Sequence, residues 1–277
     1  MSRSTLYLLA VLLAASAAIV SLQFSNAAVQ IDNAHWTGTP SPPCFIDARE
    51  CGGHVLGMDE NGRDVLARLI VGGRYTLGVA LLALAIEFGI AAALAGVKRH
   101  AGRIASAVVL YLADAVGALP RLPLVIVAVL VSHRVLAGAE HTIVGLAAIL
   151  GLVFWPRTLL VWMQRGAVGQ EPLRHAASDL VSIILLGTAV DFLGYGIFPP
   201  WPSWGNMLVG AESNFEVAWW VVVFPAACIF VTVIAIDWFR FSVPLDVARG
   251  RGIAFGKPKH AHDDTGAHDD AVVITDP

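Results

Sequence analysis

Apolar runs about as long as a bilayer is thick are the feature that most constrains this chain. Runs near 20 residues long recur along the sequence, and a helix of about 20 apolar residues spans a hydrocarbon core of roughly 30 Å. We predict six spans, at residues 6–22, 75–97, 104–131, 142–163, 180–198 and 217–239. Because 57% of the residues are hydrophobic and only 14% are charged, a soluble domain is excluded. The sequence therefore predicts an all-α integral membrane protein.

The distribution of Lys and Arg predicts the orientation of these spans. With the N-terminus inside, the cytoplasmic segments hold eleven Lys and Arg and the outer segments hold five, while Arg121 and Arg157 lie within spans. Positive side chains accumulate on the cytoplasmic side. Both termini are therefore predicted to be cytoplasmic, with residues 25–74 and 199–216 outside. The net charge of −3 gives no reason to expect nucleic acid as a partner.

The hydropathy pattern divides the chain into four segments. Residues 1–24 are predicted to be a retained N-terminal anchor, with a cleaved signal peptide as the alternative. Residues 25–74 form an outer segment and residues 75–240 the transmembrane core. Residues 241–277 are expected to be a cytoplasmic tail that is disordered at its end.

Residues 63–73 show helical periodicity just before the span at 75–97. Val65, Leu66, Leu69 and Ile70 fall on one face of such a helix, opposite the charged side chains. This pattern predicts an amphipathic helix lying on the outer membrane surface, with its apolar face turned toward lipid or packed on the spans and Arg63, Asp64 and Arg68 on the other face. An ordinary loop helix is the alternative.

Two longer motifs carry more information than their periodicity. Residues 54–77 read H-V-L-G-M-D-E-N-G-R-D-V-L-A-R-L-I-V-G-G-R-Y-T-L, and residues 191–208 read D-F-L-G-Y-G-I-F-P-P-W-P-S-W-G-N-M-L. Both resemble, in register, motifs of the permease subunits of dipeptide, oligopeptide and nickel ABC importers. The residues we select as family positions are Gly57, Asp59, Gly62, Arg63, Asp64, Pro199, Pro200, Ser203, Trp204 and Gly205.

The resemblance implies the second permease subunit of an importer in a bacterial inner membrane. Its substrate would be a peptide or a related small solute such as nickel. Its partners would be a homologous permease subunit, two ATP-binding subunits, an extracytoplasmic solute-binding protein and membrane lipid. We expect no enzymatic activity, no cofactor and no metal ion in this chain. It has no phosphate-binding G-x-x-x-x-G-K-[ST] motif, so any ATP hydrolysis is expected from another chain.

Ionisable residues inside spans are the candidates for the translocation path, since charges in a bilayer must face protein or water. Asp114 and Pro120 match the D-x-x-x-A-x-P pattern of the family, and Arg121 follows directly. Asp191 stands where the family usually has serine. A buried, purely structural Asp114 is the alternative, and Glu87 should likewise face protein or a water-filled path.

The segment between the fourth and fifth spans departs from the family. Residues 164–179 contain no E-A-A-x-x-x-G helix, which docks on the ATPase in these importers, and Pro172 is predicted to mark a tight turn. The remaining candidates for ATPase coupling are Arg165, Gly166, Glu171, Arg174 and His175. Three interpretations stay open: a permease with a minimal coupling loop, a passive half of a heterodimer, or a degenerate permease kept as a structural subunit. A channel or secondary transporter is a further rival, although we find no inverted repeats.

The cysteines and the C-terminal histidines complete the candidate sites. Cys44 and Cys51 lie in the predicted outer segment, where a disulfide between them is plausible and two free thiols are the alternative. Cys228 is expected to be a small apolar residue of the last span. The tail histidines offer weak ligands for Ni or Zn, but a solvated tail is the simpler interpretation.

Overall fold

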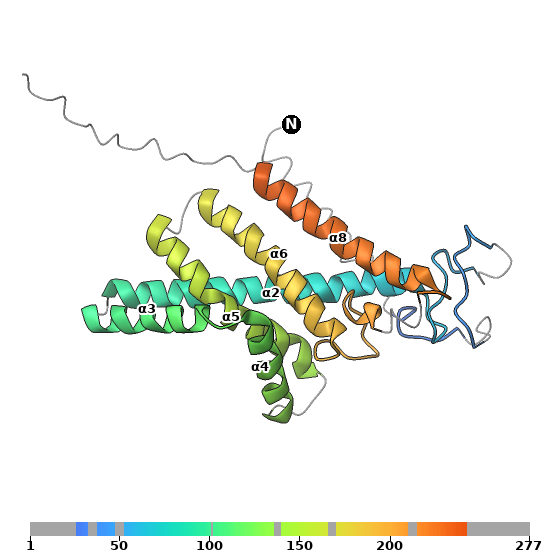
Figure 1. The fold of residues 1–277 in the computed structure, drawn as a ribbon, viewed down its shortest axis with the longest axis horizontal. Coiled ribbons are helices and arrows are strands. Elements are labelled where there is room, and N and C mark those ends of the chain that lie inside the picture. The colour runs from blue at the N-terminus through green and yellow to red at the C-terminus, as the bar shows by residue number, and fades with distance from the viewer. Residues whose placement is uncertain are drawn as a thin grey trace, which may run out of the picture. The chain divides into compact units, whose positions relative to one another are not determined.

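Seven helical elements make up the part of the chain that the structure describes. The computed structural model describes residues 26–32, 38–47, 53–100, 102–135, 140–165, 170–209 and 215–242. Its elements are α2 (Val65–His100), α3 (Arg103–Gly117), α4 (Arg121–Val135), α5 (Glu140–Arg165), α6 (Gln170–Phe192), the 3-10 helix η1 (Asn206–Leu208) and α8 (Trp219–Ser242) (Figure 1). This confirms the predicted all-α class. The predicted span at 6–22 and nearly all of the tail 241–277 lie outside the described residues.

Four of these helices are long and apolar enough to cross a membrane. Their candidate spans are Val65–Val97, Ile143–Met163, Pro172–Phe192 and Trp219–Phe241. The pair α3 and α4 makes a fifth if it is one broken span, bent by 97°. The chain is therefore a multi-pass helical membrane protein.

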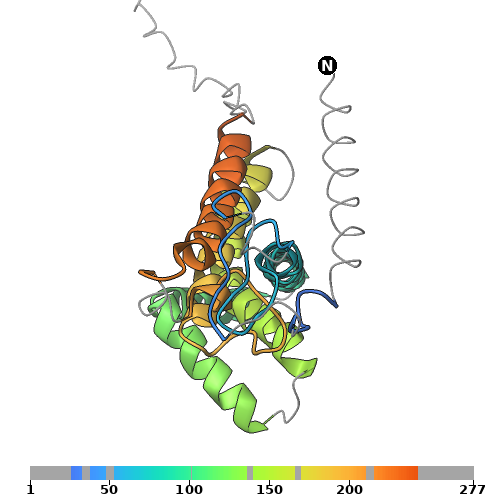
Figure 2. The same cartoon turned by 90° about the vertical axis from the view of Figure 1, so that its right-hand side faces the viewer.

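Helix α2 is the element against which most of the others pack. It is the long horizontal helix of Figure 1 and is seen nearly end-on in Figure 2. Helix α5 has the most extensive contact with it, and α6 packs on both α2 and α8. The close approach of α5 depends on Gly151, where an added Cβ would lie 2.7 Å from the backbone oxygen of Ala83. Small residues at such positions are what bring helix backbones together in membranes.

The predicted surface helix at 63–73 is not a separate element. From Val65 the chain continues as one helix to His100, so this stretch supplies the first turns of α2. Val65 and Leu69 are buried against Trp204 and Met207 of the same chain, so their face packs within the protein, as one form of the prediction allowed. Arg68, one of the charged side chains of the opposite face, is only 6% exposed. The apolar and the charged face of residues 65–73 are thus both packed within the protein. The helix therefore continues past Tyr75 without a break.

The predicted span at 104–131 is broken in the middle. Helix α3 ends at Gly117 and α4 begins at Arg121. Pro120 has no N–H to donate, and its ring disfavours helical geometry at Leu119, so the helix ends here. The carbonyl of Pro120 accepts a hydrogen bond from the Leu124 N–H at 3.2 Å and so starts the new helix.

Helix α6 begins ten residues before the predicted span at 180–198. Helix α5 continues to Arg165 and α6 begins at Gln170, so only residues 166–169 separate them. Pro172 therefore does not mark the turn; it sits in the first helical turn of α6, where a missing N–H costs no hydrogen bond. At its other end α6 stops at Phe192, and the glycine- and proline-rich residues 193–205 form turns instead of helix.

Candidate functional site

The two sequence motifs pack against each other at one end of the helix bundle. We call this contact between residues 54–77 and 191–208 the motif junction. Trp204 is its centre, because its indole N–H donates a hydrogen bond to the Leu69 carbonyl at 2.9 Å and its backbone N–H donates to Thr76 Oγ1 at 3.1 Å. A Cβ at Gly73 would lie 2.8 Å from the Trp204 ring, so that position requires glycine.

A tight turn leads into α2 on the first-motif side of the junction. Gly57 has φ +78°, and a Cβ there would come within 2.5 Å of the Ser41 carbonyl oxygen. Asp59 is buried and forms ion pairs with Arg63 at 2.9 Å and with Arg68 at 3.4 Å. Asp64 accepts a hydrogen bond from the Ala67 N–H at 2.8 Å and thereby caps the helix.

His54 ties this turn to the segment before it. Its Nδ1 lies 2.5 Å from Asp64 Oδ2, and its Nε2 lies 3.1 Å from Asp32 Oδ2. Partial burial by itself would lower the pKa of His54, but the hydrogen bonds to Asp64 and Asp32 outweigh this effect and raise the pKa above 6.5.

The second motif supplies the other side of the junction. The Pro199–Pro200 peptide bond is cis, and the fully buried Ser203 exchanges hydrogen bonds with Asn206. A Cβ at Gly205 would lie 2.4 Å from the Thr188 carbonyl oxygen, so α6 and this loop touch backbone to backbone. Asp191 accepts a hydrogen bond from the Ile197 N–H at 2.8 Å and is 3% exposed. It therefore holds the turn that starts the motif.

A cavity of about 420 Å³ lies beside the break between α3 and α4. Most of its lining is apolar, but its wall contains the charged residues Asp114, Arg121 and Arg157, and for these we call it the polar cavity. Asp114 is exposed, whereas the Arg121 guanidinium stacks on the Phe154 ring with 4.4 Å between its central carbon and the ring centroid. The predicted path residues Asp114 and Arg121 thus line the same cavity, next to the break between α3 and α4 at Pro120. Asp191 lies apart from them, at the motif junction.

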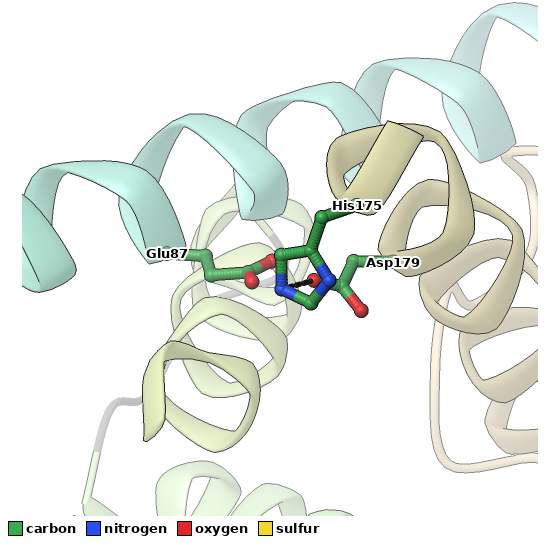
Figure 3. Close-up of side chains that lie close together, drawn as sticks. All are labelled: Glu87, His175 and Asp179. Atoms are coloured by element: carbon green, nitrogen blue, oxygen red, sulfur yellow. Dashed lines mark ion pairs between the residues drawn. The ribbon is translucent and has the colours of Figure 1, made fainter. Parts of the chain in front are cut away.

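A buried group of polar side chains lies between α2, α5 and α6. We call Glu87, Thr158, His175 and Asp179 the polar cluster; Figure 3 shows Glu87 reaching from α2 toward His175 and Asp179 on α6. His175 Nε2 lies 2.8 Å from Asp179 Oδ2. The Thr158 hydroxyl donates a hydrogen bond to Glu87 and lies 3.2 Å from His175 Nε2 and 3.3 Å from Asp179 Oδ2.

The polar cluster and the polar cavity are neighbours. Arg157 lines the cavity, and its Nη1 lies 3.3 Å from Asp179 Oδ1. The Arg157 side chain is 45% exposed, whereas that of Asp179 is fully buried. One arginine therefore connects the buried carboxylate to the open polar space.

The sequence predicts that Glu87 faces protein or water, but not which side chains surround it. Thr158 and Asp179 were not singled out, although His175 and Asp179 are four residues apart and so share a helix face. His175 was predicted to contact an ATPase, but it is 8% exposed and lies inside the cluster. Arg174 is half-buried, and the side chains of Arg165, Gly166 and Glu171 lie outside the described residues.

The cysteines are described in part. Cys44 is disulfide-bonded, whereas Cys51, its predicted partner, lies outside the described residues. Cys228 is free and half-buried in α8.

Fold and sites together define a helical membrane protein with a broken span beside a polar cavity and a junction built from two specific motifs. Comparison with known proteins identifies the class. The chain is 30% identical over 223 residues to the di/tripeptide transport system permease protein DppC of Pseudomonas aeruginosa, covering 71% of this chain and 72% of that protein. It belongs to the family of peptide ABC transporter permeases. Permease subunits of this kind are non-catalytic transmembrane components.

Two further relatives agree with this assignment. The chain is 31% identical over 219 residues to the dipeptide transport system permease protein DppC of Escherichia coli, covering 71% of this chain and 73% of that protein. It is 31% identical over 216 residues to a putative peptide permease protein of Brucella ovis, covering 67% of this chain and 69% of that protein. No protein-family model matches the chain.

Proposed function

We propose that the chain is the permease subunit of an importer for peptides or a related small solute. It forms the translocation path together with a homologous membrane subunit. Its other partners are ATP-binding subunits and an extracytoplasmic binding protein. The observation that carries the proposal is the motif junction. Both family motifs are present, an added Cβ at Gly57, Gly73 or Gly205 would lie within 3 Å of another part of the junction, and the Trp204 indole is hydrogen-bonded across it.

The polar cavity supplies the candidate path within this subunit. A peptide is a zwitterion, and a wall with two arginines and one aspartate offers groups of both signs to its termini. The cavity also lies at the only broken helix pair among the described candidate spans. Irregular backbone at membrane depth is tolerated where it lines a water-filled space.

A second function, a non-transporting structural subunit, is favoured by one observation. Residues 166–169 are all that separate α5 from α6. Four residues span at most about 14 Å when extended, so they leave no room for a separate helix that docks across an ATPase. Only the ends of α5 and α6 remain to meet such a partner.

Copurification from native membranes tests the two functions against each other. We expect the tagged chain to bring down a homologous permease and ATP-binding subunits, and its deletion to abolish uptake of a labelled dipeptide. Recovery of stable membrane subunits without an ATPase, together with unchanged dipeptide uptake, would establish the structural function instead.

Orientation is part of the same proposal. With both termini in the cytoplasm, the motif junction faces outward and the connection between α5 and α6 faces the ATPase. A cysteine introduced at Glu60, which is exposed, should react with a membrane-impermeant maleimide in intact cells. A cysteine introduced in the tail at Thr265 should react only after permeabilisation, and the reverse result would invert the topology.

A further inference from the structure

We propose that Glu87, His175 and Asp179 form a binding site for one divalent transition-metal ion of the zinc class, which clamps α6 to α2. Each residue offers one ligand atom, and these atoms lie within 4.8 Å of one another. All three residues are buried, with exposures of 0%, 8% and 0%. The site does not depend on the transport function, because an ion can hold these helices together whether or not the chain moves a solute.

The donor set suits zinc and its neighbours. One imidazole nitrogen and two carboxylate oxygens are ligand types of tetrahedral zinc sites, which hold the ion at about 2.0–2.2 Å from each ligand. Two ligands of one ion are then separated by at most about twice that distance. The present spacing of up to 4.8 Å is slightly wider. Glu87 is the one ligand on α2 (Figure 3), and a rotation of its side chain would close this difference.

One unsatisfied oxygen points independently to a missing ligand. Glu87 Oε2 is buried and has no hydrogen-bond partner within the described part of the chain, whereas Asp179 Oδ1 is held by the ion pair with Arg157 at 3.3 Å. An unpaired buried acceptor costs about 1–3 kcal/mol, and more when it is charged. Thr158 satisfies the other oxygen of Glu87, so its hydroxyl would hold one carboxylate oxygen while the second binds the ion.

The charges of the surroundings favour a cation. Two carboxylates face each other around a single imidazole, and the one described arginine that contacts them, Arg157, is ion-paired at the edge with Asp179. A dication neutralises Glu87 and Asp179 without a further charged side chain. The alternative occupant is a proton shared between the two carboxylates, and the experiment separates the two.

The position of the site gives the ion a structural consequence. His175 and Asp179 lie in the first three turns of α6, and Thr158 lies two turns before the end of α5. An ion bound there would fasten the ends of α5 and α6 to α2. In the family this is the region that receives the movement of an ATPase, so a clamp would hold these helix ends in one position.

Metal analysis of the full-length chain tests the proposal. The protein is purified without a histidine tag, stripped with a chelator, dialysed against Zn²⁺ and analysed by mass spectrometry for bound metal. We expect about one zinc per chain, and a loss of at least tenfold in Glu87→Gln, His175→Ala and Asp179→Asn. Wild-type protein should also show a higher melting temperature with zinc than without it.

Two control variants make the result specific. Asp191→Asn changes a buried carboxylate at the other end of α6 and should keep its zinc. The triple variant His260→Ala, His262→Ala, His268→Ala removes the histidines of the tail and should also keep it. Binding lost only in the tail variant would overturn the proposal, as would well-folded wild-type protein that retains no zinc and melts at the same temperature with and without it.

Discussion

The motif junction and the polar cluster both join parts of the chain that are far apart in sequence, but they are built in different ways. The junction is a close contact of backbones: glycines remove Cβ atoms, and Trp204 donates two hydrogen bonds. The cluster is made by side chains alone, from three helices. A backbone contact tolerates few substitutions at any of its positions, whereas a side-chain cluster can be altered one group at a time.

The difference matters for the family relationship. The junction preserves the motifs that this chain shares with peptide permeases, while the region around the cluster is where the chain departs from them. Four variants test whether substitutions in the junction destabilise the protein more than a substitution in the cluster does.

The largest effect is expected for Trp204→Ala. The substitution removes a buried aromatic ring and the hydrogen bond from its indole N–H to the Leu69 carbonyl, so we expect the free energy of unfolding to fall by about 3–5 kcal/mol. Unfolding in mixed micelles, followed by circular dichroism, measures the change. Trp238 is 76% exposed on α8, and Trp238→Ala should cost less than about 1 kcal/mol. Equal losses in the two variants would mean that the junction is no more tightly packed than the helix surface.

Gly57→Ala should have the next largest effect. The new Cβ would be 2.5 Å from the Ser41 carbonyl oxygen at a backbone φ of +78°, and together these predict a loss of about 2–3 kcal/mol. Gly89→Ala is the matched control, because a Cβ there meets open space within α2. The control should be neutral or more stable by up to about 1 kcal/mol. A stable Gly57→Ala protein would show that the turn can rearrange.

Thr158→Val probes the cluster and should cost less. The change keeps the shape of the side chain but leaves Glu87 without its hydroxyl donor, which predicts a loss of about 1–2 kcal/mol in unfolding free energy. Thr188→Val is the matched control, since the Thr188 hydroxyl donates only to carbonyls of its own helix and its removal should be nearly neutral. If the two variants behave alike, the cluster contributes no specific stability.

The smallest effect is a pH dependence at the junction. The pKa of His54 is raised above 6.5 by Asp64 and Asp32, so protonated His54 stabilises the folded state. This stabilisation is complete below the unfolded pKa of about 6.5 and is lost as the pH rises through the raised pKa. Partly exposed ion pairs contribute about 0–1 kcal/mol. Unfolding of wild type and His54→Gln should therefore differ most at pH 6 and converge by pH 9, and a difference that grows with pH would refute this account.

The sequence predicts those features of the structure that depend on residues close together in the chain, and not the contacts between distant segments. The helices and both sides of the junction follow from continuous stretches, because the turn at Gly57, the cap at Asp64 and the loop at Pro199 depend on their own neighbours. That the two stretches contact each other was not predicted. Burial of Arg68 was missed for the same reason, since its partner Asp59 lies outside the helical pattern that placed it on the polar face.

The cluster could not be predicted because its members are far apart in the sequence. Glu87 and Asp179 are brought together only by the packing of α2 against α6, and no spacing rule connects them. The break at Pro120 is not predicted from hydropathy, because the residues on both sides of it are mostly apolar and pass together as one long span.

The break between α3 and α4 restricts what can surround this part of the protein in the membrane. Helices α3 and α4 have 15 residues each, which at 1.5 Å per residue makes each about 22 Å long, short of the roughly 30 Å of hydrocarbon. Neither helix is long enough to cross a bilayer alone. If α3 and α4 cross it together, the 97° bend between them lies within the hydrocarbon, where lipid cannot hydrogen-bond to peptide groups. The bend must then be wetted from the adjoining polar cavity or covered by another subunit. Bare lipid is the one environment that does not suit this side of the protein.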